Sequence, residues 1–188
     1  MFFSLLSYLF HYTCFRLICS VKSKKISNNI VSGIHAFSSV FWCLIYFLSG
    51  DVIYFTISKN FSSGYFLFDI EYMIKNRKKD FYFYCMSYHH ISAIYGFYQP
   101  LVYFQPEMLF LAEISNLPNY FVYHAIQNGN EVKKLKILQK MVYVVFRVFF
   151  ISYCVYMNYF HSPDKHLFYV GFPVYLMGLG WSRVLLKN

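Results

Sequence analysis

The stretch Asp80-Phe81-Tyr82-Phe83-Tyr84-Cys85-Met86-Ser87-Tyr88-His89-His90-Ile91-Ser92-Ala93-Ile94 decides how the chain folds. Two adjacent histidines lie in the middle of a segment that is apolar enough to cross a lipid bilayer. An ionisable side chain at membrane depth is costly, so its presence is by default a hypothesis about function. We therefore expect the face that carries His89 and His90 to point into the protein. The other side of the same helix is then covered by Tyr84, Tyr88, Ile91 and Tyr95.

The composition of the whole chain predicts an integral membrane protein. Its 188 residues are 58% hydrophobic and only 13% charged, whereas soluble domains average about 25% charged residues. At roughly 20 residues per span, this length accommodates about seven transmembrane helices with short loops. A net charge of +9 would suggest a nucleic-acid partner in a soluble protein, but the positions of the charges argue against nucleic acid here.

Seven apolar segments are predicted to be transmembrane helices, at residues 2–19, 30–48, 61–75, 81–98, 103–124, 139–160 and 167–186. The first segment lacks a basic region before it and a small-residue cleavage site, so it is interpreted as a retained anchor. Residues 1–29 then form an anchor helix with a basic loop, and residues 30–188 form the membrane domain. Six spans preceded by an interfacial helix are the alternative.

The basic residues between these segments alternate from one side of the membrane to the other. Fourteen of them fall on the side that includes the C-terminus, and two fall on the opposite side. By the positive-inside rule, the C-terminus is cytosolic and the N-terminus lies outside.

Five predicted helices each bring a polar or charged side chain to the middle or the cytosolic half of the bilayer. We expect them to line one central cavity, formed by His35, Asp69, His89, His90, Ser92, Glu113, Asn116 and Arg147. An unpaired buried charge is expensive, so Arg147 is expected to form an ion pair with Asp69 or Glu113. A single intramembrane histidine is more often a helix–helix hydrogen bond than a catalyst, but the convergence of these groups favours a functional cavity. The five cysteines are interpreted as small buried side chains, with no metal site among them.

The order of these residues resembles the TLC domain family. Asp80, Met86 and the pair His89-His90 are similar to its D…M…HH core. Residues His35, Gly64–Asp69 and Glu113–Asn116 are similar to its other landmarks, so the resemblance covers about residues 30–186. It implies an all-helical membrane domain of the endoplasmic reticulum, with several spans around a central cavity to which Asp80 also contributes.

The resemblance also implies two kinds of function. In the ceramide synthases of this family, the histidine pair and two aspartates serve acyl transfer from acyl-CoA to a sphingoid base. Here Glu113 keeps one carboxylate, Asn116 replaces the second, and Ala112 and Ala93 replace a histidine and a threonine. The chain is thus more similar to the branch without ceramide synthase activity, whose members are tied to membrane lipid composition or to cargo transport.

Two hypotheses follow. In the first, the protein acts in membrane lipid homeostasis by binding or regulating lipids or a membrane-protein cargo. In the second, it is a lipid N- or O-acyltransferase that uses acyl-CoA as substrate and needs no cofactor; His89 or His90 is the general base, and Glu113 orients it. An ion or solute carrier stays open as a third class. A di-iron desaturase needs more histidines in spaced boxes, and the motifs of a seven-helix receptor do not occur.

Overall fold

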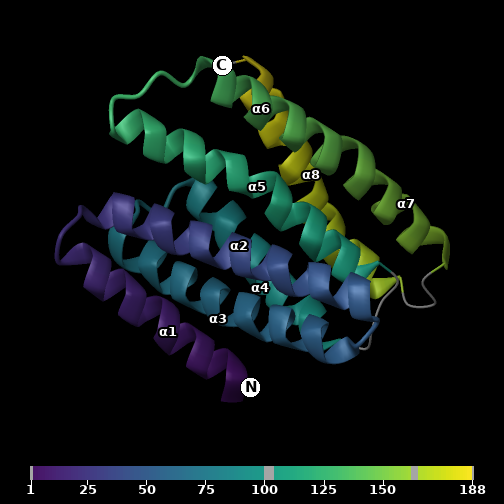
Figure 1. Ribbon diagram of the computed structural model, residues 1–188. Coiled ribbons are helices and arrows are strands. Elements are labelled where there is room, and N and C mark those ends of the chain that lie inside the picture. Colours follow the sequence, from purple (N-terminus) through teal and green to yellow (C-terminus); the bar gives the residue numbers. More distant parts are fainter. Residues whose placement is uncertain (1, 100–103, 162–164, 188) are drawn as a thin grey trace.

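The computed structural model describes residues 2–99, 104–161 and 165–187, and every regular element in these ranges is helical. In chain order the elements are α1 Phe2–Cys19, α2 Lys24–Ser49, α3 Val52–Asn76, α4 Phe81–Tyr98, α5 Gln105–Gln127, α6 Lys133–Tyr143, η1 Val144–Phe150, α7 Ile151–His161 and α8 His166–Lys187 (Figure 1). Element η1 is a π-helix that joins α6 and α7 into one continuous segment. The prediction of an all-helical fold is confirmed.

Three helical segments in the described part of the chain are long and apolar enough to cross a membrane. They are Phe2–Cys19, Lys24–Ser49 and Lys133–His161. The other helices interrupt their apolar runs with histidines, tyrosines and charged residues. Seven membrane crossings therefore stay a prediction.

The predicted bounds are right for α1 and α4 and wrong for α3. This helix begins at Val52 and not at residue 61, because Asp51 caps it: the carboxylate Oδ1 accepts a hydrogen bond from the backbone N–H of Ile53 over 2.9 Å. Gly50 ends α2 in the left-handed conformation, at φ 71°. The connection between α2 and α3 is thus two residues long, and Lys59, which was assigned to that connection, lies inside α3.

Helix α2 also begins earlier than predicted, at Lys24 in place of residue 30. Ser23 is its N-cap, and its hydroxyl accepts a hydrogen bond from the backbone N–H of Ile26. A basic first turn at Lys24 and Lys25 was interpreted as loop, although lysine is a good helix former. Helix α2 runs across residue 30, where the two predicted domains meet, and that division stays a prediction.

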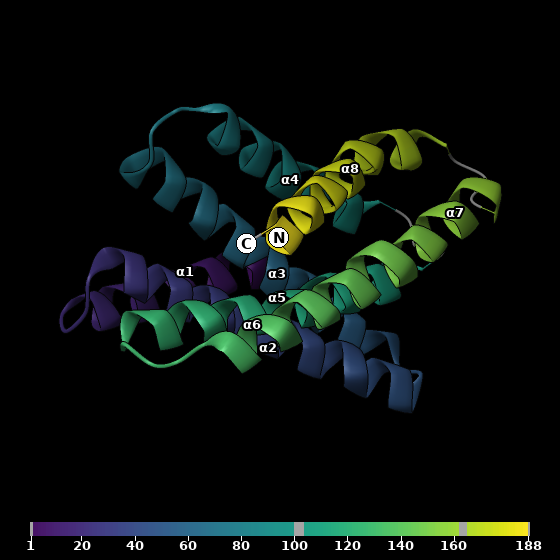
Figure 2. The same cartoon turned by 90° about the horizontal axis from the view of Figure 1, so that it is seen from above.

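Six helical segments form a closed ring. Following contacts between neighbours, the order is α2, α3, α4, α8, the continuous segment α6–η1–α7, α5, and back to α2. Figure 2 shows α4 and α8 on one side of this ring, with α2, α3 and α5 on the other. The ring order differs from the chain order, because α5 lies beside α2 and α8 lies beside α4.

Helix α1 lies outside the ring and packs along α3, with a further contact to α2. It runs parallel to α3: Ser4 meets Asn60 near one end, and Phe15 meets Tyr72 near the other. The close approach depends on Gly64, since a Cβ at that position would lie 2.5 Å from the carbonyl oxygen of Ser4. Helix α1 is therefore an integral part of the packed structure.

The core lies between α2, α3, α4 and α5. Its buried apolar side chains are Val31, Cys43, Phe55, Tyr65, Phe66, Phe68, Phe97 and Leu109. On α4, the predicted outward stripe is confirmed, because Tyr84, Tyr88, Ile91 and Tyr95 are all exposed. The opposite face of α4 buries His90 and Ser92 and so contributes to the interior of the ring.

Candidate functional site

Two cavities lie end to end inside the ring. One has a volume of about 210 Å³ and a mainly apolar wall, and the other has a volume of about 410 Å³ and is lined by most of the polar and charged side chains of the interior. We call them the apolar cavity and the polar cavity. The side chains that line both of them, and so mark their boundary, are Phe66, His89, Glu113 and Arg147.

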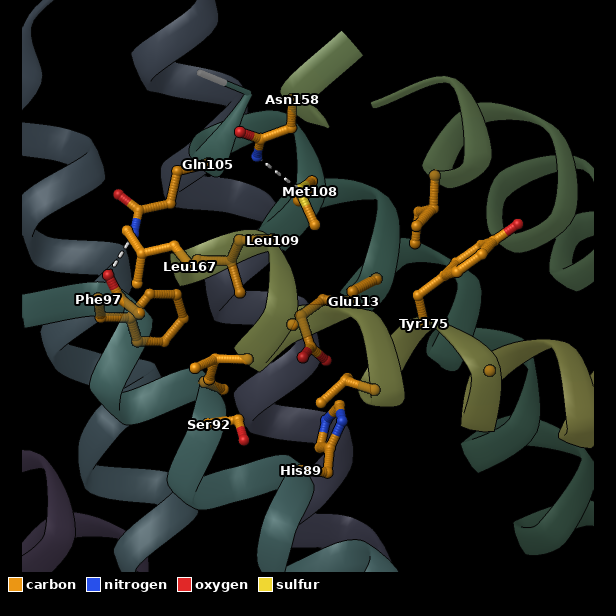
Figure 3. Close-up of a pocket in the computed structure, with 18 of the residues that line it drawn as sticks. His89, Ser92, Phe97, Gln105, Met108, Leu109, Glu113, Asn158, Leu167 and Tyr175 are labelled. Carbon is orange, nitrogen blue, oxygen red and sulfur yellow. Dashed lines mark hydrogen bonds between the residues drawn. The ribbon is translucent and has the colours of Figure 1, made fainter. Parts of the chain in front are cut away.

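The apolar cavity lies toward the C-terminal end of α4 and the N-terminal ends of α5 and α8. Its wall includes Ala93, Phe97, Leu109, Ile151, Leu167, Val170 and Val174 (Figure 3). Two amides lie at its end: Gln105 donates to the carbonyl of Gly96 over 2.6 Å, and Asn158 contacts the sulfur of Met108 at 4.0 Å. Ser92, a predicted site residue, lines this apolar cavity.

The polar cavity lies toward the opposite ends of the same helices, which are the ends predicted to face the cytosol. Of the predicted site residues, His35, Asp69, His89, His90, Glu113, Asn116 and Arg147 line it. The structure therefore brings together seven side chains that come from α2, α3, α4, α5 and η1. Seven of the eight side chains expected to share a cavity thus lie together, and Ser92 lies in the neighbouring one.

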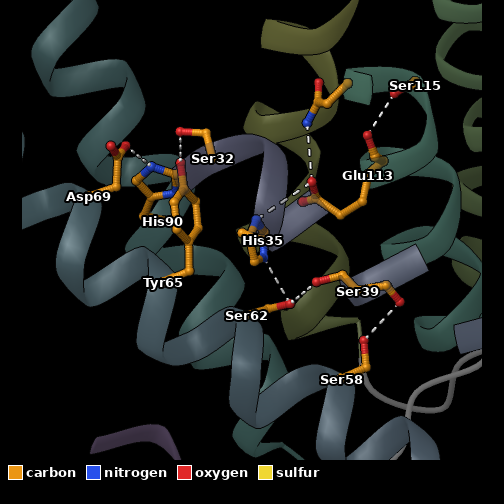
Figure 4. A network of polar contacts seen from close by, with 12 residues as sticks. Ser32, His35, Ser39, Ser58, Ser62, Tyr65, Asp69, His90, Glu113 and Ser115 are labelled. Carbon is orange, nitrogen blue, oxygen red and sulfur yellow. Dashed lines mark hydrogen bonds and ion pairs between the residues drawn. The ribbon is translucent and has the colours of Figure 1, made fainter. Parts of the chain in front are cut away.

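His90 is held by Asp69 and not by Glu113. Its Nε2 lies 2.9 Å from Oδ2 of Asp69 (Figure 4). Asn28 donates to Oδ1 of the same carboxylate over 3.3 Å. Because a carboxylate only accepts hydrogen bonds, Nε2 of His90 carries the proton. Its Nδ1 is buried without a hydrogen-bond partner among the described residues, and in the neutral imidazole this nitrogen carries the lone pair.

Glu113 instead lies beside His35. Its Oε2 is 3.8 Å from Nδ1 of His35 and accepts a hydrogen bond from Asn116 over 3.5 Å. The other ring nitrogen of His35 contacts the hydroxyl of Ser62 at 3.1 Å, and its ring stacks on Tyr65 at a centroid distance of 4.0 Å. The expectation that Glu113 orients His89 or His90 is thus corrected, because the ring order places α5 next to α2.

Arg147 makes no ion pair with a carboxylate in the part of the chain that the structure describes. Its guanidinium donates to the hydroxyl of Ser115 over 2.8 Å, to the carbonyl of Ala112 over 3.1 Å and to the amide oxygen of Asn116 over 3.1 Å. The ion pair expected with Asp69 or Glu113 is therefore wrong. Neutral oxygens of α5 accept from Nε and Nη2 of the guanidinium instead, since its five N–H donors form a wide fork that can reach several acceptors.

Asp80 lines neither cavity. It is the exposed N-cap of α4, and its carboxylate accepts the backbone N–H of Phe83 over 2.9 Å. The position that resembles the family's first landmark thus serves to begin the helix that carries the histidines. Its role as a cavity-lining residue is corrected on this ground.

His89 has a different environment from His90. It faces both cavities, and its Nδ1 is buried without a hydrogen-bond partner in the described ranges. The two imidazole rings meet edge to face, with centroids 5.3 Å apart. The pair therefore consists of one histidine fixed by a carboxylate and one that is free to contact a bound molecule.

The polar cavity is also lined by three side chains that were not among the predicted site residues, Gln139, Tyr143 and Trp181. Gln139 donates to the side-chain oxygen of Asn119 over 2.8 Å and thereby joins α6 to α5. A signal was available, because Gln139 and Tyr143 precede Arg147 at steps of four residues. No group of three or more potential metal ligands occurs within the described residues.

The chain matches no protein-family model, no curated protein and no solved structure. The chemistry of the site is therefore argued from its own geometry.

Proposed function

We propose that this chain is a multi-pass membrane protein of the TLC type that acts in membrane lipid homeostasis by binding a lipid inside its ring. The closed ring, the apolar exposed surface of α4 and the three segments suited to cross a membrane support this proposal. The parallel packing of α1 along α3 favours seven crossings over an interfacial first helix. A location in the endoplasmic reticulum, with the N-terminus lumenal and the C-terminus cytosolic, completes the proposal.

The observation that carries the proposal is the succession of a polar and an apolar cavity along one axis. A lipid is amphipathic, so it fits a site whose polar groups occupy one end and whose apolar walls occupy the other. Its headgroup would contact His89, Glu113 and Arg147, and its chain would lie along Ala93 and Leu109.

The length of the apolar cavity sets the chain that it can hold. His89 and Phe97 lie eight residues apart on α4, which corresponds to about 12 Å at the rise of an α-helix. At about 1.25 Å per methylene, projected from ordinary bond lengths and angles, this depth accommodates roughly ten carbon atoms. Longer chains would extend beyond the described cavity.

Filling the apolar cavity tests the proposal. In Ala93→Phe, a ring replaces a methyl group on the cavity wall, whereas Ile91→Phe adds a ring on the exposed side of the same helix and is the matched control. Both proteins are purified in mild detergent, and their co-purifying lipids are identified by mass spectrometry. We expect Ala93→Phe to lose bound lipid and Ile91→Phe to keep it. Equal lipid in both variants, or none in the unmodified protein, would contradict lipid binding and favour a cargo-binding role.

The contact between His90 and Asp69 favours lipid acyl transfer as a second candidate. Asp69 holds the tautomer in which Nδ1 of His90 is basic. In this reaction the hydroxyl or amine of an acceptor lipid loses its proton to Nδ1 and attacks the carbonyl of an acyl thioester. The C–S bond then breaks, and the leaving thiolate takes the proton from the imidazolium.

Acyl transfer is tested by comparing His90→Asn with Ile91→Asn, a change on the lipid-facing side of the same turn. Cellular lipid profiles and acyl-CoA consumption by the purified protein are measured for both. Loss of consumption in His90→Asn alone would support the enzyme. If His90→Asn still binds lipid and neither variant nor the unmodified protein consumes acyl-CoA, the result contradicts acyl transfer and supports a lipid-binding protein without enzymatic activity.

A further inference from the structure

Arg147 is a buried cation that forms no direct ion pair with a carboxylate among the described residues. The side chain is 9% exposed, and the two carboxylates of the polar cavity have other partners: Asp69 contacts His90, and Glu113 contacts Asn116. Arginine keeps its charge in proteins, so it cannot relieve this cost by losing a proton. A buried charge that is satisfied only by neutral oxygens retains a strong attraction for an anion.

The guanidinium also keeps one nitrogen free. Nε and Nη2 donate to Ser115, Ala112 and Asn116, while Nη1 has no hydrogen-bond partner among the residues described. On that side lies Gly178 of α8, where a Cβ would be 3.8 Å from Nη1. The absence of a side chain at Gly178 leaves the space beside Nη1 open to the cavities.

The backbone is arranged to hold Arg147 at this place. The buried residues Gln139, Tyr143, Arg147 and Ile151 recur every four residues, and on an α-helix each such step overshoots a full turn by about 40°. The π-helix η1, which covers seven residues around Arg147, has a wider turn and so keeps the four side chains on one face. Such segments within α-helices occur frequently at functional sites.

We propose that the headgroup of the bound amphiphile is anionic, a carboxylate or a phosphate, and that Arg147 binds it through Nη1. This inference rests on the proposed lipid-binding function and names the class of ligand. His89, which lines both cavities beside Arg147, is placed to contact the same headgroup. The chain of the amphiphile then lies in the apolar cavity.

The test uses four ten-carbon probes that differ only in their headgroup: decanoate, decyl phosphate, decanol and decylamine. Trp181 lines the polar cavity, so its fluorescence reports binding once the other tryptophan is removed by Trp42→Phe. Affinities are measured for the full chain in detergent, for Arg147→Met and for Arg183→Met. Arg183 is an exposed arginine of α8 and serves as the matched control.

We expect Arg147→Met to lower the affinity for decanoate, decyl phosphate or both by about ten- to a hundredfold, which is the range for the loss of a hydrogen bond to a charged group. Decanol and decylamine should bind this variant as they bind the unmodified protein, and Arg183→Met should leave all four unchanged. A larger loss for decyl phosphate identifies a phosphate headgroup, and a larger loss for decanoate identifies a fatty acid. Comparing variants with the same probe cancels the partition of each probe into detergent.

Two results would overturn the inference. In the first, Arg147→Met lowers the affinity for decanol as much as the affinity for the two anions. In the second, Arg147→Met binds both anions with the affinity of the unmodified protein. If Arg147→Met does not fold, Gly178→Leu takes its place, because the larger side chain occupies the space beside Nη1. Gly178→Leu must then lower the affinity for the two anions more than the affinity for decanol. Gly180→Leu, at an exposed glycine of the same helix, is the control. If no probe binds the unmodified protein, decanol included, the proposed lipid-binding function itself fails.

Discussion

The imidazole of His90 donates a hydrogen bond to the carboxylate of Asp69 over 2.9 Å, and this contact joins α4 to α3 inside the ring. Both side chains are buried, at 3% and 7% exposed. Removing one partner of such a pair leaves the other buried without its hydrogen bond, which costs more than the pair itself contributes.

Asp69→Ala is therefore expected to lower the free energy of unfolding by about 3 kcal/mol, since both His90 and Asn28 lose an acceptor. Asp69→Asn keeps one side-chain oxygen and should cost less than half as much. Thermal and chemical unfolding of the purified proteins, followed by circular dichroism, measures both. Equal stabilities of Asp69→Ala and the unmodified protein would show that the contact does not hold α3 and α4 together.

Substituting Gly64 should displace α1. A Cβ at this position would lie 2.5 Å from the carbonyl oxygen of Ser4 and from Cβ of Ser7. Gly64→Ala is expected to destabilise the protein by about 1–3 kcal/mol through overpacking and to abolish a disulfide engineered between α1 and α3. Gly180→Ala, at a glycine with no atom within 4 Å of the added Cβ, is the control and should leave the disulfide intact. Formation of the disulfide in both variants would contradict the close packing of α1.

Asp80 should affect stability and not lipid binding. Asp80→Ala removes the N-cap of α4, which accepts the backbone N–H of Phe83, so we expect a loss of about 1 kcal/mol. Asp80→Ser, which restores a capping oxygen, should recover most of it. The amount of co-purifying lipid should be the same in all three proteins. If Asp80→Ala lost bound lipid while its stability stayed unchanged, Asp80 would have to take part in lipid binding.

The proposed topology places the two exposed loops at Asp51 and Glu131 on opposite sides of the membrane. In a chain whose five cysteines are replaced, a cysteine at position 131 should react with a membrane-impermeant maleimide in sealed microsomes, because their outer face is the cytosolic one. A cysteine at position 51 should react only after the microsomal membrane is opened with detergent. Reaction of both cysteines from the same side would contradict seven crossings.

Properties of single helices followed from the sequence alone. The apolar runs located all seven helical segments, because the length of an apolar segment and its hydrophobic periodicity are local features. For α4 they also identified the outward face at Tyr84, Tyr88, Ile91 and Tyr95, and the inward position of His90. The convergence of His35, Asp69, His90 and Glu113 was predicted from their similar depth along separate helices.

The partners of those side chains depended on the tertiary structure. Glu113 lies beside His35, and Asp69 lies beside His90, because α5 neighbours α2 and α4 neighbours α3 in the ring. Depth along a helix cannot specify this order, since helices that are neighbours in the ring are not always neighbours in the sequence. The same order brings α8, with Gly178, to the free nitrogen of Arg147. The sequence by itself indicated most of the charged groups that reach the interior, because their depth along each helix is a local property, and only the packing of the helices decided which of them meet.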